Sequence, residues 1–325
     1  MAIARPRFGA REETQWQRNR WKTKELVMSR RHLSDAMKQR PWVPHFYRTM
    51  LMSSTGGQTS GLLDVGCGSG FLTRLFGREL IPGGKVSNVI GIDINGKSLR
   101  AARREETRHP LPANRRIEYI RADAYHLPFR SSSFELVTSR TVLMHLSSPK
   151  KALREMTRVC KRNGHLAPLE PDWGAFSSYD PDDPRAEKEG ETALKAEIRG
   201  RRKLYGQDPA IGRRLPDLLH GAGLRDITID GIFEGPMTPC DYRTRRRTLS
   251  QEYSLSLKNL SNKRRVDEYT KVLVAGGLSK AWIRRYLRGR RTRLLRRSRQ
   301  LKFQGSKERM TSFFAVPLFL AMGKK

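Results

Sequence analysis

The chain has 325 residues, enough for one large domain or two small ones with a sizeable core. Lys and Arg (65 residues) outnumber Asp and Glu (32 residues), which gives a formal net charge of +33. The hydrophobic fraction of 37% is well above that of a disordered chain, so the composition indicates a folded protein.

The composition also excludes several classes of protein. The three cysteines have no metal-ligand spacing, so we expect no metal site and no disulfide framework. The most apolar run, Phe313 to Met322, is about half of a membrane span, and no N-terminal stretch resembles a signal peptide. We therefore expect a cytoplasmic protein with reduced thiols and no transmembrane segment.

The positive charge is distributed unevenly along the chain. Residues 61–240 carry a net charge of +6, whereas residues 241–310 contain 22 basic and 5 acidic residues, a net charge of +17. We expect four parts along the chain: an N-terminal helical cap (1–60), a core (61–240), a basic helical insertion that acts as a lid or binds substrate (241–310), and a last strand that returns to the core (311–325).

The first strand of the core is predicted at Leu62–Val65, and a helix is predicted at 71–80. Between them, Gly66, Gly68 and Gly70 occupy every second position, which allows a sharp turn and lets a ligand lie against bare main chain. A dinucleotide-binding loop has the spacing G-x-G-x-x-G and needs no acid before its first glycine. Asp64 would repel a pyrophosphate but attract a cation, so the pattern favours a nucleoside with a positively charged appendage.

Three more strands follow, and each ends in polar or acidic residues. They are predicted at 89–93, 117–124 and 134–140, and a helix capped by Asn95 is predicted at 97–108. A further helix is predicted from Pro149 to Lys161, closed by Asn163-Gly164. In an open parallel sheet, the carboxyl ends of the strands form the edge where ligands bind.

The rest of the core is predicted to hold a fifth strand at 165–170, helices at 185–204 and 209–221, a sixth strand at 224–233 and a last strand at 311–323. Pro168 and Pro317 fall inside two of these strands, where proline usually marks a bulge or an edge. The basic insertion is expected to form two or three helices with breaks at Gly276-Gly277 and at Gly289.

Five motifs in this order and spacing resemble those of class I S-adenosylmethionine-dependent methyltransferases: LLDVGCGSG, GIDIN, RADAYHLPF, FELVTSRTVLMHL and ALREMTRVCKRNGHLAPLEPDWG. Within that superfamily the chain is similar to the ubiquinone and menaquinone biosynthesis branch, over about residues 62–235 and the last strand. The resemblance implies an α/β fold with a Rossmann-like, seven-stranded, mostly parallel sheet and helices on both faces. It also implies S-adenosylmethionine as the cofactor.

The resemblance further implies a set of cofactor-binding residues. The glycine loop would line the methionine side, Asp93 would accept from the ribose, and Asp123 with Ala124 would flank the adenine. Arg140 at the end of the fourth strand would hold the methionine carboxylate. The full expected set is Asp64, Gly66, Cys67, Gly68, Gly70, Asp93, Ile94, Asp123, Ala124 and Arg140.

His145 and Glu170 are the candidate catalytic residues, because a proton acceptor is needed when the nucleophile must lose a proton. A packed histidine, and a structural turn around Pro171, are alternatives for these two positions. Asp172 and Trp173 would also line the acceptor side. Since the sulfonium is already a good leaving group, the reaction needs mainly alignment and exclusion of water.

The sequence therefore predicts methyl transfer to an O, N or C nucleophile of a small molecule. The alternative is an RNA or DNA methyltransferase whose arginine-rich residues 241–310 bind phosphates. The same basic residues would also suit an anionic membrane surface, or form a solvated face. A non-catalytic protein that binds the cofactor is a third class.

Overall fold

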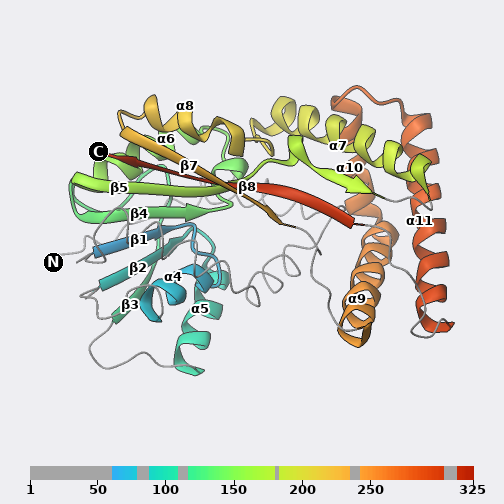
Figure 1. Cartoon of the computed structure of the whole chain (residues 1–325), viewed down its shortest axis with the longest axis horizontal. Coiled ribbons are helices and arrows are strands. Elements are labelled where there is room, and N and C mark those ends of the chain that lie inside the picture. Colours follow the sequence, from blue (N-terminus) through green and yellow to red (C-terminus); the bar gives the residue numbers. More distant parts are fainter. Residues whose placement is uncertain (1–60, 79–87, 109–115, 180–182, 235–241, 304–312) are drawn as a thin grey trace.

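The computed structural model describes residues 61–78, 88–108, 116–179, 183–234, 242–303 and 313–325 (Figure 1). The expected N-terminal helical cap at 1–60 lies outside the described residues, as does Cys240.

A single mixed sheet organises the core (Figure 1). Its parallel strands are β1 (Gly61–Val65), β2 (Asn88–Asp93), β3 (Arg116–Arg121), β4 (Phe134–Arg140) and β5 (Cys160–Pro171). The order is β3-β2-β1-β4-β5-β8, and β7 (Arg225–Glu234) pairs with the other side of β8 (Phe313–Lys324). Five of the described strands are parallel, and β8 is antiparallel to both β5 and β7. The predicted seven-stranded, mostly parallel sheet is therefore confirmed. A short strand that was not predicted, β6 (Ser177–Tyr179), pairs with the start of β8.

Both faces of the sheet are buried, which explains the continuous apolar runs of its strands. Leu63 of β1 belongs to one hydrophobic cluster, together with helices α6 (Pro149–Val159) and α8 (Leu215–His220). Leu62, the preceding residue, belongs to a second cluster with helix α4 (Phe71–Arg78). Since successive strand residues point to opposite faces, these helices lie on opposite sides of the sheet.

The register brings the ends of the strands into one row. Asp93 pairs with Arg121, Val65 pairs with both Ile92 and Ser139, and Arg140 pairs with Leu169. Gly66, which follows Val65, therefore begins the glycine loop between the end of β2 and the end of β4. This row is the carboxyl edge at which the sequence predicted a ligand.

The predicted boundary between α6 and β5 was wrong. Helix α6 ends at Val159, and Asn163-Gly164 lies inside β5 rather than closing the helix. Phe134 pairs with Cys160 and Leu136 with His165, so the extra residues of β5 form a bulge. A side chain at Gly164 would place its Cβ 2.8 Å from the Glu135 carbonyl oxygen, so this Asn-Gly pair serves a close strand contact.

The two strand prolines do not interrupt their strands. Pro168 lies opposite Ser139 within the β4–β5 pairing, and Pro317 lies opposite Phe233 within the β7–β8 pairing. The Pro317 carbonyl oxygen also accepts a hydrogen bond from the Asp172 backbone N–H at 2.8 Å. Proline lacks only the donor of the ladder, so its carbonyl still contributes.

A layer of helices stands beyond the carboxyl edge of the sheet, at the end of the molecule opposite the C-terminus (Figure 1). It consists of α7 (Pro184–Tyr205), α9 (Tyr242–Ser261), α10 (Lys263–Ala275) and α11 (Lys280–Phe303). The break at Gly276-Gly277 is confirmed, but Gly289 lies inside α11 and the predicted break there was wrong. The preceding break is at Asn262, whose side chain caps α10 by accepting from the Arg265 backbone N–H.

Helix α7, which lies in the predicted core segment 61–240, packs against the helices of the basic insertion. Ala193 and Ala196 of α7 share a hydrophobic cluster with residues of α10 and α11. A Cβ on Gly200 of α7 would collide with the Val272 carbonyl oxygen of α10, so glycine is required at this crossing. None of the helices described here is long and apolar enough to cross a membrane.

Helix α5 (Gly96–Arg108) follows β2 and completes the cover of the first strands. It begins one residue earlier than predicted. The Asn95 side chain accepts from the Lys97 backbone N–H at 3.0 Å, so Asn95 acts as the predicted cap.

Candidate functional site

The glycine loop between β1 and α4 has left-handed backbone at all three glycines. Their φ angles are 71° at Gly66, 59° at Gly68 and 75° at Gly70. A Cβ on Gly66 would collide with Val142, and one on Gly70 would lie 2.5 Å from the Tyr119 hydroxyl. A Cβ on Gly68 would meet nothing within 4 Å. Packing thus requires the first and last glycines, whereas the middle one borders open space in which a ligand can lie against the main chain.

Asp93, at the end of β2, holds this loop in place. Its Oδ2 accepts from the Gly68 backbone N–H at 2.9 Å, and its Oδ1 accepts from the Asn95 N–H at 2.8 Å. The Cys67 N–H donates to the Ile92 carbonyl oxygen at 2.8 Å. The carboxylate predicted to receive a ribose therefore also organises the loop.

Asp64 lies beneath the loop and is 1% exposed. Its Oδ2 accepts from the Thr73 hydroxyl of α4 at 2.6 Å. Burial raises the pKa of Asp64 from 3.8 to about 6, although the Thr73 hydrogen bond and the positive charge of Arg140 lower it. Asp64 thus places a buried negative charge under the loop at neutral pH.

Two buried polar atoms at this edge have no hydrogen-bond partner within the described part of the chain. They are Nη1 of Arg140 and Oγ of Ser139. The guanidinium carbon of Arg140 lies 5.3 Å from the centre of the Phe71 ring, at the start of α4. Because buried polar groups are almost always paired in native proteins, this edge has the character of a site that receives a polar ligand.

The turn after β3 carries the residues predicted to flank an adenine. Asp123 Oδ1 accepts from the Tyr125 N–H at 2.9 Å, and the Ala122 N–H donates to the Asp93 carbonyl oxygen at 3.3 Å. The Ile94 carbonyl oxygen accepts from Arg121 at 3.0 Å. Ile94 and the turn that carries Asp123 and Ala124 thus follow neighbouring strands of the sheet, and their role toward an adenine stays a prediction.

Glu170, near the end of β5, is fully buried and bonded to backbone. Its Oε1 accepts from the N–H groups of Val142 and Leu143, each at 2.8 Å, and its Oε2 accepts from that of Met144 at 3.3 Å. These three donors begin the 3-10 turn η1 (Leu143–His145). This geometry favours a structural role for Glu170, because the carboxylate oxygens that a general base would use accept the hydrogen bonds that hold η1 in place. A catalytic role for Glu170 stays a prediction.

His145 is the last residue of η1 and is half-buried. Its carbonyl oxygen accepts from the Gln207 side-chain amide at 3.2 Å. This contact fixes the backbone of His145. The role of the His145 side chain in proton transfer stays a prediction.

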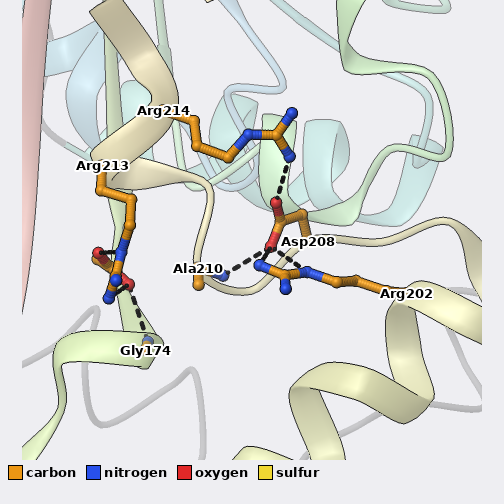
Figure 2. Close-up of polar contacts among 7 residues, drawn as sticks. Gly174, Arg202, Asp208, Ala210, Arg213 and Arg214 are labelled. Atoms are coloured by element: carbon orange, nitrogen blue, oxygen red, sulfur yellow. Dashed lines mark hydrogen bonds and ion pairs between the residues drawn. The ribbon is translucent and has the colours of Figure 1, made fainter.

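The carboxylate of Asp172, expected to line the acceptor side, is buried and bonded to other residues. It is 1% exposed, pairs with Arg213, and accepts from the Gly174 N–H at 2.8 Å (Figure 2). Trp173 stacks on Phe176, with ring centres 6.2 Å apart. Sequence reasoning missed Gln207, Asp208 and Arg213. Gln207 and Arg213 contact residues 62 and 41 positions away, and the six-residue spacing of Asp208 from Arg202 and Arg214 follows no helix or strand period. Among the residues that the structure describes, no cluster of three or more His, Cys, Asp or Glu could hold a metal ion.

Residues 63–167 match the family model described as a methyltransferase domain. The chain is 33% identical to an uncharacterized methyltransferase of Schizosaccharomyces pombe over 162 aligned residues, which cover 49% of this chain and 54% of the relative. It is 37% identical to the ubiquinone/menaquinone biosynthesis C-methyltransferase UbiE of Hahella chejuensis over 111 aligned residues, which cover 34% of this chain and 43% of that protein. The chain thus matches about half, or less, of the length of these curated relatives.

A solved structure of Haemonchus contortus phosphoethanolamine N-methyltransferase 2, in complex with S-adenosyl-L-methionine, aligns with 96% of this chain and 57% of its own. The TM-score is 0.44 and the sequence identity is 15%.

The sheet order, the glycine loop and the family match agree over one part of the chain: residues 63–167 match a methyltransferase domain and lie within a Rossmann-like sheet. The resemblance predicted from the sequence motifs is confirmed over these residues, which match a methyltransferase domain and are similar to UbiE C-methyltransferases.

Proposed function

We propose that the protein is an S-adenosylmethionine-dependent methyltransferase that acts on an O, N or C nucleophile of a small molecule. The observation that carries this proposal is the open space at Gly68 together with the buried Nη1 of Arg140, which has no hydrogen-bond partner among the described residues. A carboxylate accepts bidentate hydrogen bonds from a guanidinium, so Arg140 suits the methionine end of the cofactor.

The other residues of the site fit the same ligand. The open backbone at Gly68 would border the methionine chain, Asp93 would accept from the ribose hydroxyls, and Asp123 with Ala124 would flank the adenine. The ionised Asp64 would add a negative charge near the cationic sulfonium. When bound, the cofactor supplies an activated methyl group on a good leaving group.

The protein's own part in such a reaction is alignment and exclusion of water. Glu170 holds η1, whose last residue is His145. We propose His145 as the proton acceptor where the acceptor group must lose a proton. We also propose that α7, α9, α10 and α11 act together as the lid, because they share one hydrophobic cluster and stand beyond the ligand-binding edge (Figure 1). A cytoplasmic location stays a prediction.

The test is transfer of radiolabelled methyl from S-adenosylmethionine into a native cell extract, separated into organic-soluble and nuclease-sensitive fractions. We expect label in the organic-soluble fraction with the wild type, and a large loss of it with Arg140→Met. Absence of label from both fractions, with the cofactor bound, would favour the third class, a non-catalytic binding protein.

A second candidate function, methylation of a nucleic acid, is favoured by one face of α11. That face exposes six arginines within about four helical turns, and they are Arg284, Arg285, Arg288, Arg291, Arg296 and Arg299. Helix α11 contains no acidic residue. The apolar side chains of Ile283 and Tyr286 are buried within the helical layer. A helix that lies in a membrane surface inserts its apolar face, so this exposed face suits a polyphosphate better than a bilayer.

Charge reversal separates the two candidates. Arg288→Glu with Arg291→Glu should abolish nuclease-sensitive labelling if a nucleic acid is the acceptor, and should leave organic-soluble labelling unchanged if it is not. The control is Arg264→Glu, an exposed arginine on α10. A loss of affinity that is equal in the double variant and the control would indicate a general charge effect only.

A further inference from the structure

The segment that follows α7 lies between η1 and the end of β5, and it is bonded to both. The Asp208 N–H donates to the Met144 carbonyl oxygen at 3.2 Å, and the Gln207 side-chain amide donates to that of His145 at 3.2 Å. On the other side, the Trp173 N–H donates to the Pro209 carbonyl oxygen at 3.1 Å. Three pieces of the acceptor side therefore meet at residues 207–209.

The carboxylate of Asp208 is the centre of a charged network (Figure 2). Its Oδ1 accepts from Arg202 at 2.9 and 2.7 Å, and its Oδ2 accepts from Arg214 at 2.8 Å. Its Oδ1 also accepts from the Ala210 N–H at 3.1 Å. Asp208 is 6% exposed, whereas the two arginine side chains are about half exposed, so a single buried acid holds two guanidinium groups that would otherwise repel each other.

The pair of Asp172 and Arg213 fixes the neighbouring part of the same segment to β5 (Figure 2). A Cβ on Gly212 would lie 2.8 Å from the Glu170 carbonyl oxygen, so the segment is in close contact with the strand. The residues around Asp208 thus rest against the strand that carries Glu170.

The turn η1 is consequently held at both ends. Glu170 accepts from its first N–H groups, and residues 207–208 donate to its last two carbonyl oxygens. Of these two contacts, only the second one leads to the helical layer, because Arg202 lies in the last turn of α7. Helix α7 packs on α10 at Gly200, and its last turns reach η1 through two neighbouring residues. Arg202 donates to Asp208, whose N–H donates to the Met144 carbonyl oxygen. Arg201 donates at 3.5 Å to the side chain of Gln207, which contacts His145.

We propose that Asp208 is a positioning residue, which through Arg202 and Arg214 sets the position of η1 and couples it to the helical layer. This inference rests on the proposed function, since it assigns η1 to the acceptor side of that site. Asp208 does not touch the glycine loop, so its removal should alter the binding and alignment of the acceptor while leaving that of the cofactor unchanged.

The first test is hydrogen–deuterium exchange of the full chain. Asp208→Asn should raise exchange of the backbone amides of η1 about tenfold, because the two guanidinium groups lose their shared charge. Calorimetric affinity for S-adenosylhomocysteine should stay within about twofold of the wild type, because the cofactor residues are untouched. The matched control is Asp217→Asn, which neutralises an exposed acid in the first turn of α8.

A milder variant guards against misfolding. Arg202→Met removes only the contact to α7 and keeps the Asp208–Arg214 pair, so it should raise the exchange of η1 without unfolding the chain. In the extract assay, Asp208→Asn should increase the amount of acceptor fraction needed for half-maximal labelling, and Asp208→Glu should restore part of the loss.

Two outcomes are distinct. If the exchange of η1 is the same in the wild type, Asp208→Asn and Arg202→Met, the coupling is refuted whatever the enzyme does. If exchange rises as expected but the wild type transfers no methyl group and binds no S-adenosylhomocysteine, the proposed function is wrong. The coupling of η1 to the helical layer would then be supported, but it would have no role in methyl transfer.

Discussion

Replacement of Arg140 by methionine should weaken binding of the cofactor without weakening the fold. In the described structure, Nη1 of Arg140 is buried without a partner, so the guanidinium carries a cost that a bound carboxylate would relieve. Hydrogen bonds to charged groups contribute about 1.5–3 kcal/mol, and each 1.4 kcal/mol is a factor of ten, so the affinity should fall about 10- to 100-fold.

The same change should alter stability little. Removing a buried donor that has no partner relieves a penalty of about 1–3 kcal/mol. Against this, the contact of Arg140 with the Phe71 ring is lost, worth about 0.5–1 kcal/mol. Loss of its attraction to Asp64 is unfavourable too. The opposing contributions should leave the free energy of unfolding within about 1 kcal/mol of the wild type.

The assay combines titration calorimetry with S-adenosylmethionine and urea denaturation of the same preparations. Arg199→Met is the control, because Arg199 donates to the Gly276 carbonyl oxygen at 2.9 Å, far along the chain from the glycine loop. That control should lose about 1 kcal/mol of stability and no affinity. The reasoning is refuted if Arg140→Met binds the cofactor as tightly as the wild type, or if it unfolds far more easily.

Three further predictions follow from the site. Gly68→Ala should abolish most cofactor binding, because the added methyl group fills the open space at the loop. The control is Gly223→Ala, at a φ of 84° and equally free of neighbours, which should lose similar stability but no cofactor affinity. Titration calorimetry measures both affinities, and equal values for the two variants would contradict the position assigned to the cofactor. Glu170→Gln should destabilise the fold by about 2–4 kcal/mol in urea, because three N–H donors lose a carboxylate; a change well below that range would show that η1 does not depend on it. Burial raises the pKa of Asp64 from 3.8 to about 6, so the folded state binds its proton more tightly than the unfolded state. The stability of the wild type relative to Asp64→Asn should therefore fall by about 3 kcal/mol as the pH rises from about 3 to about 8, and a flat difference would contradict the burial.

The cofactor side of the site was predictable because its signals are local. Alternating glycines after an apolar strand have few structural explanations, and the register of a parallel sheet then places Asp93 and Arg140 beside the loop. The acceptor side was less predictable. Glu170 was identified as a functional candidate, but its contact with η1 joins residues 27 positions apart, and no sequence pattern reports that contact.

The errors have physical causes as well. Asn163-Gly164 after an amphipathic helix is typical of a helix end, yet here it forms a bulge, because Gly164 must approach the Glu135 carbonyl oxygen. Gly289 was expected to break a helix, but α11 continues through it, since tertiary packing of neighbouring apolar residues outweighs the low helix propensity of one glycine.

The most direct measurement is methyl transfer from radiolabelled S-adenosylmethionine into a fractionated native extract, with the wild type and Arg140→Met assayed side by side. The account predicts label in the organic-soluble fraction for the wild type and little for the variant at the same cofactor concentration. Equal labelling by both proteins would contradict the assignment of Arg140 to the cofactor. Label confined to the nuclease-sensitive fraction would contradict the small-molecule acceptor and favour the arginine face of α11 as the substrate-binding surface.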